Sequence, residues 1–128
     1  MSTKTLLAVA LLLAPLPARA GAIEKALAQL APEERSHQVC ALKGLETVRR
    51  DARLRGADRL KSSIFTPAVL DAAAVLTAKG GAVRSGNRWY ALSFTCKLTA
   101  DLMKATSFTF AVGEEGPMKA WDKYGLWR

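Results

Sequence analysis

The chain has 128 residues, about half of them hydrophobic, with a formal net charge of +8, two cysteines and one histidine. We expect a chain of this length to form one domain with one modest core. The positive charge favours anionic partners such as lipid headgroups, polysaccharide or nucleic acid, and a single histidine argues against histidine-based metal or nucleophile chemistry.

Residues 1–20 are predicted to be a cleavable secretory signal. Lys4 provides a positive start, residues 6–14 contain only Leu, Ala and Val, and Ala18-Arg19-Ala20 places small residues where a signal peptidase cuts. The apolar run is about half of the ~20 residues that a membrane-spanning helix needs, so a retained anchor is the weaker alternative. We therefore expect cleavage after Ala20, which leaves a single exported domain over residues 21–128, periplasmic or extracellular, without a transmembrane anchor.

Export determines what is expected of the two cysteines, Cys40 and Cys96. In an oxidising compartment they are expected to pair, whereas two free thiols or a metal-binding pair are the alternatives. Closing so long a loop would stabilise the fold by about 4 kcal/mol on the chain-entropy model. Loss of Lys4 and Arg19 with the signal lowers the formal charge from +8 to +6, so the exported domain stays basic.

The first part of the exported region has helical periodicity. Residues 23–30 carry an apolar stripe at helical spacing. A second helix is predicted from Pro32, which suits a first turn, to about residue 52. Gly44 should cost this helix about 1 kcal/mol relative to Ala. We attribute it to close approach of the segment to which Cys40 is tied.

After these helices the pattern changes to that of strands. A short strand is predicted to end near Phe65, and residues 68–79 are left open between a strand, a helical turn and a loop. Gly80-Gly81 predicts a turn or a bulge. Residues 82–84 are predicted as a short strand and residues 85–87 as a hairpin turn.

The strongest strand signal covers residues 88–98, where apolar and polar side chains alternate. Residues 104–112 alternate in the same sense and are predicted to be a partner strand. Cys96 lies on the core face of the first strand, so the helix that carries Cys40 must cross that face. The sequence thus predicts an α+β fold, with N-terminal helices packed on a small antiparallel sheet, one helix-to-sheet disulfide, and a short C-terminal helix that opens at Gly116-Pro117.

Several short motifs occur in a recognisable order. Residues 82–96 read A-V-R-S-G-N-R-W-Y-A-L-S-F-T-C, followed by S-F-T-F at 107–110 and W-D-K-Y-G-L at 121–126; P-E-E-R at 32–35, Cys40 and A-D-R-L at 57–60 precede them. This ordered set resembles the bacterial domain-of-unknown-function family 930 over nearly all of the exported region. The resemblance implies a Gram-negative envelope protein and brings no known activity or catalytic residue.

A run of six basic residues within 13 positions is the main candidate binding feature. It is either a solvated helix end or an anion-binding patch, and pairs such as Glu46–Arg50 and Asp51–Arg55 would neutralise part of it. Export makes nucleic acid a poor partner, so lipid headgroups, lipopolysaccharide phosphate or an acidic protein fit better. The residues are Arg49, Arg50, Arg53, Arg55, Arg59 and Lys61.

Trp89 and His37 are the other side chains that could carry a function. Trp89 lies on the strand face opposite Cys96; it would contact a ligand or partner if that face is exposed, or cover a second small core beneath the C-terminal tail. His37 and Cys40 are three residues apart, but a zinc site needs three or four ligands. We therefore predict His37 on the helix surface, and no metal or cofactor.

The sequence favours a non-catalytic exported domain that binds an envelope protein or an anionic surface component. The alternative is a small-ligand binder with a pocket between the helices and the sheet. A small hydrolase or redox enzyme is less favoured. Adjacent acids such as Glu33/Glu34 and Glu114/Glu115 do not form a separated acid–base pair, and the two cysteines are too far apart in sequence for an exchange motif.

Overall fold

The computed structural model describes the backbone of residues 16–126 and the side chains of residues 21–126. Residues 1–15, which hold most of the predicted signal, lie outside the described residues. The elements, in chain order, are α2 (Leu16–Ala28), α3 (Pro32–Val48), the 3-10 turn η1 (Ala52–Leu54), β1 (Ala57–Lys61), β2 (Val69–Leu70), β3 (Val75–Ser85), β4 (Arg88–Leu98), β5 (Ala105–Glu115), α4 (Met118–Trp121) and the 3-10 turn η2 (Asp122–Tyr124).

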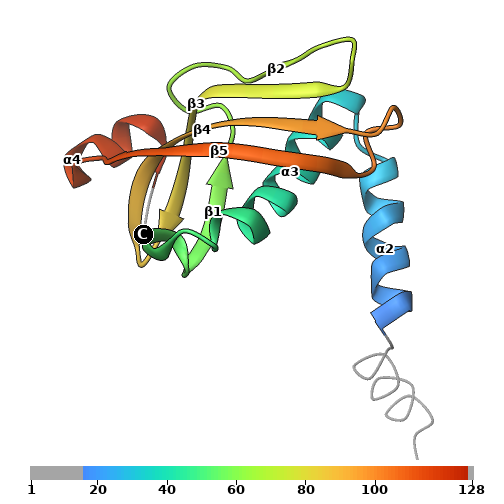
Figure 1. Ribbon diagram of the computed structural model, residues 1–128, viewed down its shortest axis with the longest axis horizontal. Coiled ribbons are helices and arrows are strands. Elements are labelled where there is room, and N and C mark those ends of the chain that lie inside the picture. Colours follow the sequence, from blue (N-terminus) through green and yellow to red (C-terminus); the bar gives the residue numbers. More distant parts are fainter. Residues whose placement is uncertain (1–15, 127–128) are drawn as a thin grey trace, which may run out of the picture.

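The strands form one antiparallel sheet in the order β1-β3-β4-β5, with the short β2 paired to the first half of β3. Helix α3 crosses one face of the sheet, α4 lies at the far end of the strands, and α2 extends away from the sheet (Figure 1). The predicted α+β architecture, with N-terminal helices, an antiparallel sheet and a short C-terminal helix, is confirmed.

Helix α2 begins upstream of the helix predicted over residues 23–30. Pro17 is its second residue, a position where the missing backbone N–H costs nothing. The predicted cleavage point after Ala20 therefore falls within this helix, and cleavage there stays a prediction. The helix ends at Ala28, and the Arg35 side chain donates hydrogen bonds to the backbone carbonyls of Leu27, Ala28 and Leu30.

Helix α3 starts at Pro32, as predicted, but stops at Val48 rather than near residue 52. The reason lies in Asp51, whose carboxylate accepts a hydrogen bond from the backbone N–H of Arg53 at 2.9 Å and thereby starts η1. An aspartate that binds a nearby backbone amide competes with helix continuation.

The predicted disulfide between Cys40 and Cys96 is formed, and it joins α3 to β4 with their Cα atoms 6.1 Å apart. Both cysteines are fully buried in the core between α3 and the sheet. A Cβ atom on Gly44 would lie 2.7 Å from Phe108, which is paired with Cys96 across the strands. Gly44 thus allows close approach of the sheet, as predicted, but the nearest atoms belong to Phe108 on β5 and Leu60 on β1 rather than to β4, the strand to which Cys40 is tied.

The strands before β4 cover more residues than the sequence predicted. Strand β1 ends at Lys61 rather than near Phe65, after which the amides of Ile64 and Phe65 both donate to the Gly80 carbonyl. The ambiguous segment 68–79 supplies β2 and the start of β3, and the predicted strand at 82–84 is only the last part of β3. The register between β3 and β4 shifts between Ala78 and Gly81, which identifies the glycine pair as a bulge.

The first half of β3, residues 75–79, was left open although its burial alternates, because Val75 and Leu76 place apolar side chains on both faces. The second half, which includes the predicted strand at 82–84, is buried on both faces. One face belongs to the main core. The other face is covered by a second, smaller core in which Ala82 and Trp89 pack against Trp121 and Leu126. The C-terminal segment thereby covers part of the outer face of the sheet. Strand β5 also continues to Glu115, three residues beyond its predicted end.

Candidate functional site

Four of the six basic residues of the predicted patch lie on the connection between α3 and β1, and the other two, Arg59 and Lys61, lie in β1 itself; we call residues 49–61 the basic turn. In Figure 1 the connection between α3 and β1 lies on the lower side of the sheet, at the start of β1. Gly56 in the turn lies close to Ser85 and Gly86, so the turn lies next to the β3–β4 hairpin.

Three of the six basic side chains make contacts within the protein. The Arg49 guanidinium donates to the Ala57 carbonyl at 2.9 Å and thus links the end of α3 to β1. Arg53 forms an ion pair of 3.4 Å with Asp51, and the hydrogen bonds that Asp51 accepts from Arg53 lower the pKa of its carboxyl group. Lys61 is half-buried and donates to a backbone carbonyl near the C-terminus.

The other three side chains, those of Arg50, Arg55 and Arg59, are exposed. Among residues 16–126 they make no hydrogen bond or ion pair, and the predicted pairs Glu46–Arg50 and Asp51–Arg55 are not formed in this part of the chain. Their positive charges are therefore available to an anion from outside.

An ion pair that sequence reasoning missed lies next to the basic turn. The Arg84 guanidinium on β3 donates to both carboxylate oxygens of Asp58 at 2.8 and 2.6 Å, and it lies 5.9 Å from the centre of the Trp89 ring. These hydrogen bonds lower the pKa of Asp58. Asp58 belongs to the A-D-R-L motif and Arg84 to the R-S motif. Both motifs were recognised in the sequence, but the contact between them was not predicted.

Trp89 is not on an exposed face of the sheet. Only 2% of its surface is accessible, because it packs with Trp121 and Leu126 beneath the C-terminal segment. Of the two arrangements predicted for this side chain, the structure shows the buried one, so Trp89 does not offer an open aromatic surface to a partner.

The predicted acid–base and metal candidates are dispersed. His37 is hydrogen-bonded through Nδ1 to the hydroxyl of Ser62. Glu33 and Glu34 are exposed in the first turn of α3. Within the described part of the chain, no three His, Cys, Asp or Glu residues form a group that could hold a metal ion. No helix among residues 16–126 is long and apolar enough to cross a membrane.

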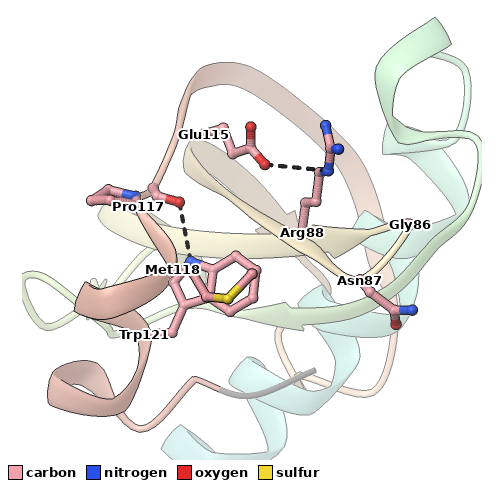
Figure 2. Close-up of a pocket in the computed structure, with 8 residues that line it drawn as sticks. Gly86, Asn87, Arg88, Glu115, Pro117, Met118 and Trp121 are labelled. Atoms are coloured by element: carbon pink, nitrogen blue, oxygen red, sulfur yellow. Dashed lines mark hydrogen bonds and ion pairs between the residues drawn. The ribbon is translucent and has the colours of Figure 1, made fainter.

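A surface depression of about 620 Å³ lies between the β3–β4 hairpin and α4 (Figure 2). Arg88 and Glu115 form an ion pair of 3.5 Å across it, and the Trp121 indole N–H donates to the Gly116 carbonyl at 3.1 Å. The lining contains Asn87 and Met118 as well, but no nucleophile with an adjacent base. Its geometry therefore fits a binding surface better than an acyl- or phosphoryl-transfer site.

A second, more apolar cavity of about 260 Å³ lies between the outer face of the sheet and the C-terminal segment. Five of its twelve lining residues are aromatic, and the cavity was not predicted from the sequence. The predicted small-ligand pocket was placed between the helices and the sheet, whereas this cavity lies on the opposite face of the sheet. The aromatic residues in its lining are Phe65, Trp89, Tyr90, Trp121 and Tyr124.

Comparisons with known proteins give a family and no activity. No curated protein matches the chain, and no solved structure matches it either. The family model of the Domain of Unknown Function DUF930 matches residues 27–126. The match spans α3, the whole sheet and the C-terminal segment, which is well over half of the sequence. The chain therefore belongs to the DUF930 family.

Proposed function

We propose that this protein is an exported, non-catalytic domain of the bacterial envelope that binds phosphate-bearing lipid headgroups through Arg50, Arg55 and Arg59. The observation that carries the proposal is that these three guanidinium groups are exposed and make no ion pair within residues 16–126. Export, inferred from residues 1–20 and consistent with the disulfide, would bring the domain to the envelope.

The chemistry of arginine favours phosphate as the ligand. A guanidinium group is always charged and donates paired hydrogen bonds that match the oxygens of a phosphate. Near an anionic membrane surface each basic side chain contributes about 1 kcal/mol. Three such side chains together would strengthen binding by about 100-fold.

The scaffold suits this role because the basic turn is held at both ends. Arg49 links the end of α3 to β1, and the Asp58–Arg84 ion pair links β1 to β3. The disulfide joins α3 to β4. The three arginines thus project from a constrained turn, so less conformational entropy is lost when they bind.

The test is binding to lipid vesicles of the exported protein and of the triple variant Arg50→Glu, Arg55→Glu and Arg59→Glu. Vesicles that contain phosphatidylglycerol are compared with vesicles of phosphatidylcholine alone, and the bound fraction is measured by co-sedimentation. We expect the exported protein to bind the anionic vesicles, more weakly at high salt, and the variant to bind them about 100-fold more weakly.

The matched control is the triple variant Lys79→Glu, Lys97→Glu and Lys104→Glu. These three lysines are exposed on β3, β4 and the loop before β5, so the control changes the net charge equally and leaves the basic turn intact. Equal binding by the exported protein and the arginine variant would refute the proposal. An equal loss of vesicle binding in the arginine variant and the lysine variant would also refute the proposal, because net charge alone would then explain binding.

Arg49 and Arg53 are left unchanged in this design. Both make contacts within the protein, so reversing their charge would disturb the turn itself.

A further inference from the structure

The aromatic cavity on the outer face of the sheet is the feature that the proposed lipid-binding role leaves unexplained. Its floor includes Ala82 and Ala91, whose small side chains leave space above β3 and β4. The C-terminal segment forms the opposite wall, with Pro117 and Ala120 facing the same space. The cavity is thus a hollow between two layers.

The walls are aromatic and held in place. Phe65 and Tyr124 meet edge to face, with ring centres 4.8 Å apart and planes at 75°. The Trp121 indole N–H is already bonded to the Gly116 carbonyl, so this ring offers the cavity an apolar surface. Aromatic rings in offset or edge-to-face contact attract one another beyond simple burial of area. A flat aromatic ligand would therefore find complementary partners on several sides.

Access is from the side on which Phe65 and Tyr124 lie. These two side chains are 46% and 37% exposed, whereas Trp89 and Trp121 at the inner wall are almost fully buried. The volume of about 260 Å³ lies just below the range of roughly 300–1,000 Å³ that holds drug-sized ligands. The ligand must accordingly be small, with one or two rings.

Charges around the cavity select against ionic ligands. The Arg84 guanidinium lies 5.9 Å from the centre of the Trp89 ring, and the Lys123 amine lies 5.6 Å from that of Tyr124. These two side chains already make the cation–π contacts of the two rings, and their positive charges would repel a cationic ligand. Glu114, an exposed carboxylate in the lining, disfavours an anion.

From these observations we propose that the cavity is a binding site for a small neutral aromatic molecule. None of the residues that line the cavity belongs to the basic turn, so this proposal does not rest on the lipid-binding proposal and can fail or succeed separately.

Indole is a suitable probe because it is neutral, flat and of two rings. The binding assay follows the indole N–H signals of the protein's tryptophans in ¹⁵N NMR spectra, since Trp89 and Trp121 both line the cavity. We expect saturable shifts with a dissociation constant on the order of a millimolar or tighter. Tetramethylammonium, a cation that favours aromatic cages, is expected to bind more weakly than indole.

The variant Ala120→Leu places a larger side chain into the cavity from α4. Its expected effect is weaker indole binding by about tenfold or more, with the fold retained because Leu is a good helix former. The control Ala100→Leu adds the same atoms to an exposed loop away from the cavity and should leave binding unchanged.

Three results would overturn the proposal. The first is the lack of any saturable shift up to the solubility limit of indole, and the second is equal binding by Ala120→Leu and the unaltered protein. The third is binding that appears only after the substitution Trp127→Ala. Trp127 follows Leu126, which lines the cavity, and such a result would make the Trp127 side chain itself the occupant.

Discussion

The disulfide offers the sharpest test of how this fold is stabilised. Its cysteines are 56 positions apart in sequence, and both are fully buried in the main core. On the chain-entropy model, opening a loop of this length costs about 4 kcal/mol of unfolding free energy. Since small domains are stable by only about 5–15 kcal/mol, the double variant Cys40→Ala and Cys96→Ala should lose a large share of its stability.

Urea unfolding followed by tryptophan fluorescence measures this loss, because Trp89 and Trp121 are buried in the folded protein. Removing the crosslink should also raise the dependence of the unfolding free energy on urea, since an unlinked unfolded chain exposes more surface. The unaltered protein in the presence of a reductant is the control, because it loses the crosslink but keeps both sulfur atoms. A loss below about 1 kcal/mol in both samples, or two freely alkylatable thiols in the purified protein, would refute this account.

Two further predictions concern single contacts. Gly44→Ala should lower the unfolding free energy by about 1 kcal/mol or more, although Ala has the better helix propensity. The reason is that the new methyl group would lie 2.7 Å from Leu60 and from the buried Phe108 ring. An increase in the urea midpoint of unfolding would contradict the close packing of α3 on β5. The pKa of Asp58 is lowered by hydrogen bonds from Arg84, so the pair stabilises the fold above the ordinary value of 3.8 and loses this effect as the pH falls through the lower, folded value. Asp58 is half-exposed, so we expect Asp58→Asn to lower the unfolding free energy by about 1 kcal/mol at pH 7. The difference in unfolding free energy between the variant and the unaltered protein should shrink below pH 3.8. A difference that stays constant between pH 7 and pH 3 would show that the ion pair does not contribute to stability.

Local sequence patterns were sufficient for those parts of the fold that have one buried face. The alternation of residues 88–98 predicted β4 with its observed bounds, and the Pro32 start of α3 was also correct. The first half of β3 was left open, because Val75 and Leu76 are both apolar and the sequence therefore does not display the alternating burial that the structure shows over residues 75–79. The predicted end of α3 was wrong because it depends on one hydrogen bond, which the Asp51 carboxylate accepts from the Arg53 backbone N–H.

The candidate sites show a similar division. The basic run was visible as a cluster, but sequence spacing could not separate Arg49 and Arg53, which bind within the protein, from Arg50 and Arg55, which do not. The i, i+4 pairing rule applies only on a continuous helix, and α3 ends before Arg50. The aromatic cavity was invisible because its lining comes from segments that are far apart in sequence, at residues 65, 82–91 and 114–126.

The sequence by itself determined that Cys40 and Cys96 can meet. Helical periodicity put Cys40 on the buried stripe of α3, strand alternation put Cys96 on the core face of β4, and two buried faces in one small domain must pack together. Only the tertiary structure decided which polar groups pair and which faces stay open. Those outcomes depend on the contacts that each side chain makes with distant segments, as between Asp58 and Arg84 or between Trp89 and the C-terminal segment. Periodicity along one segment carries no information about them.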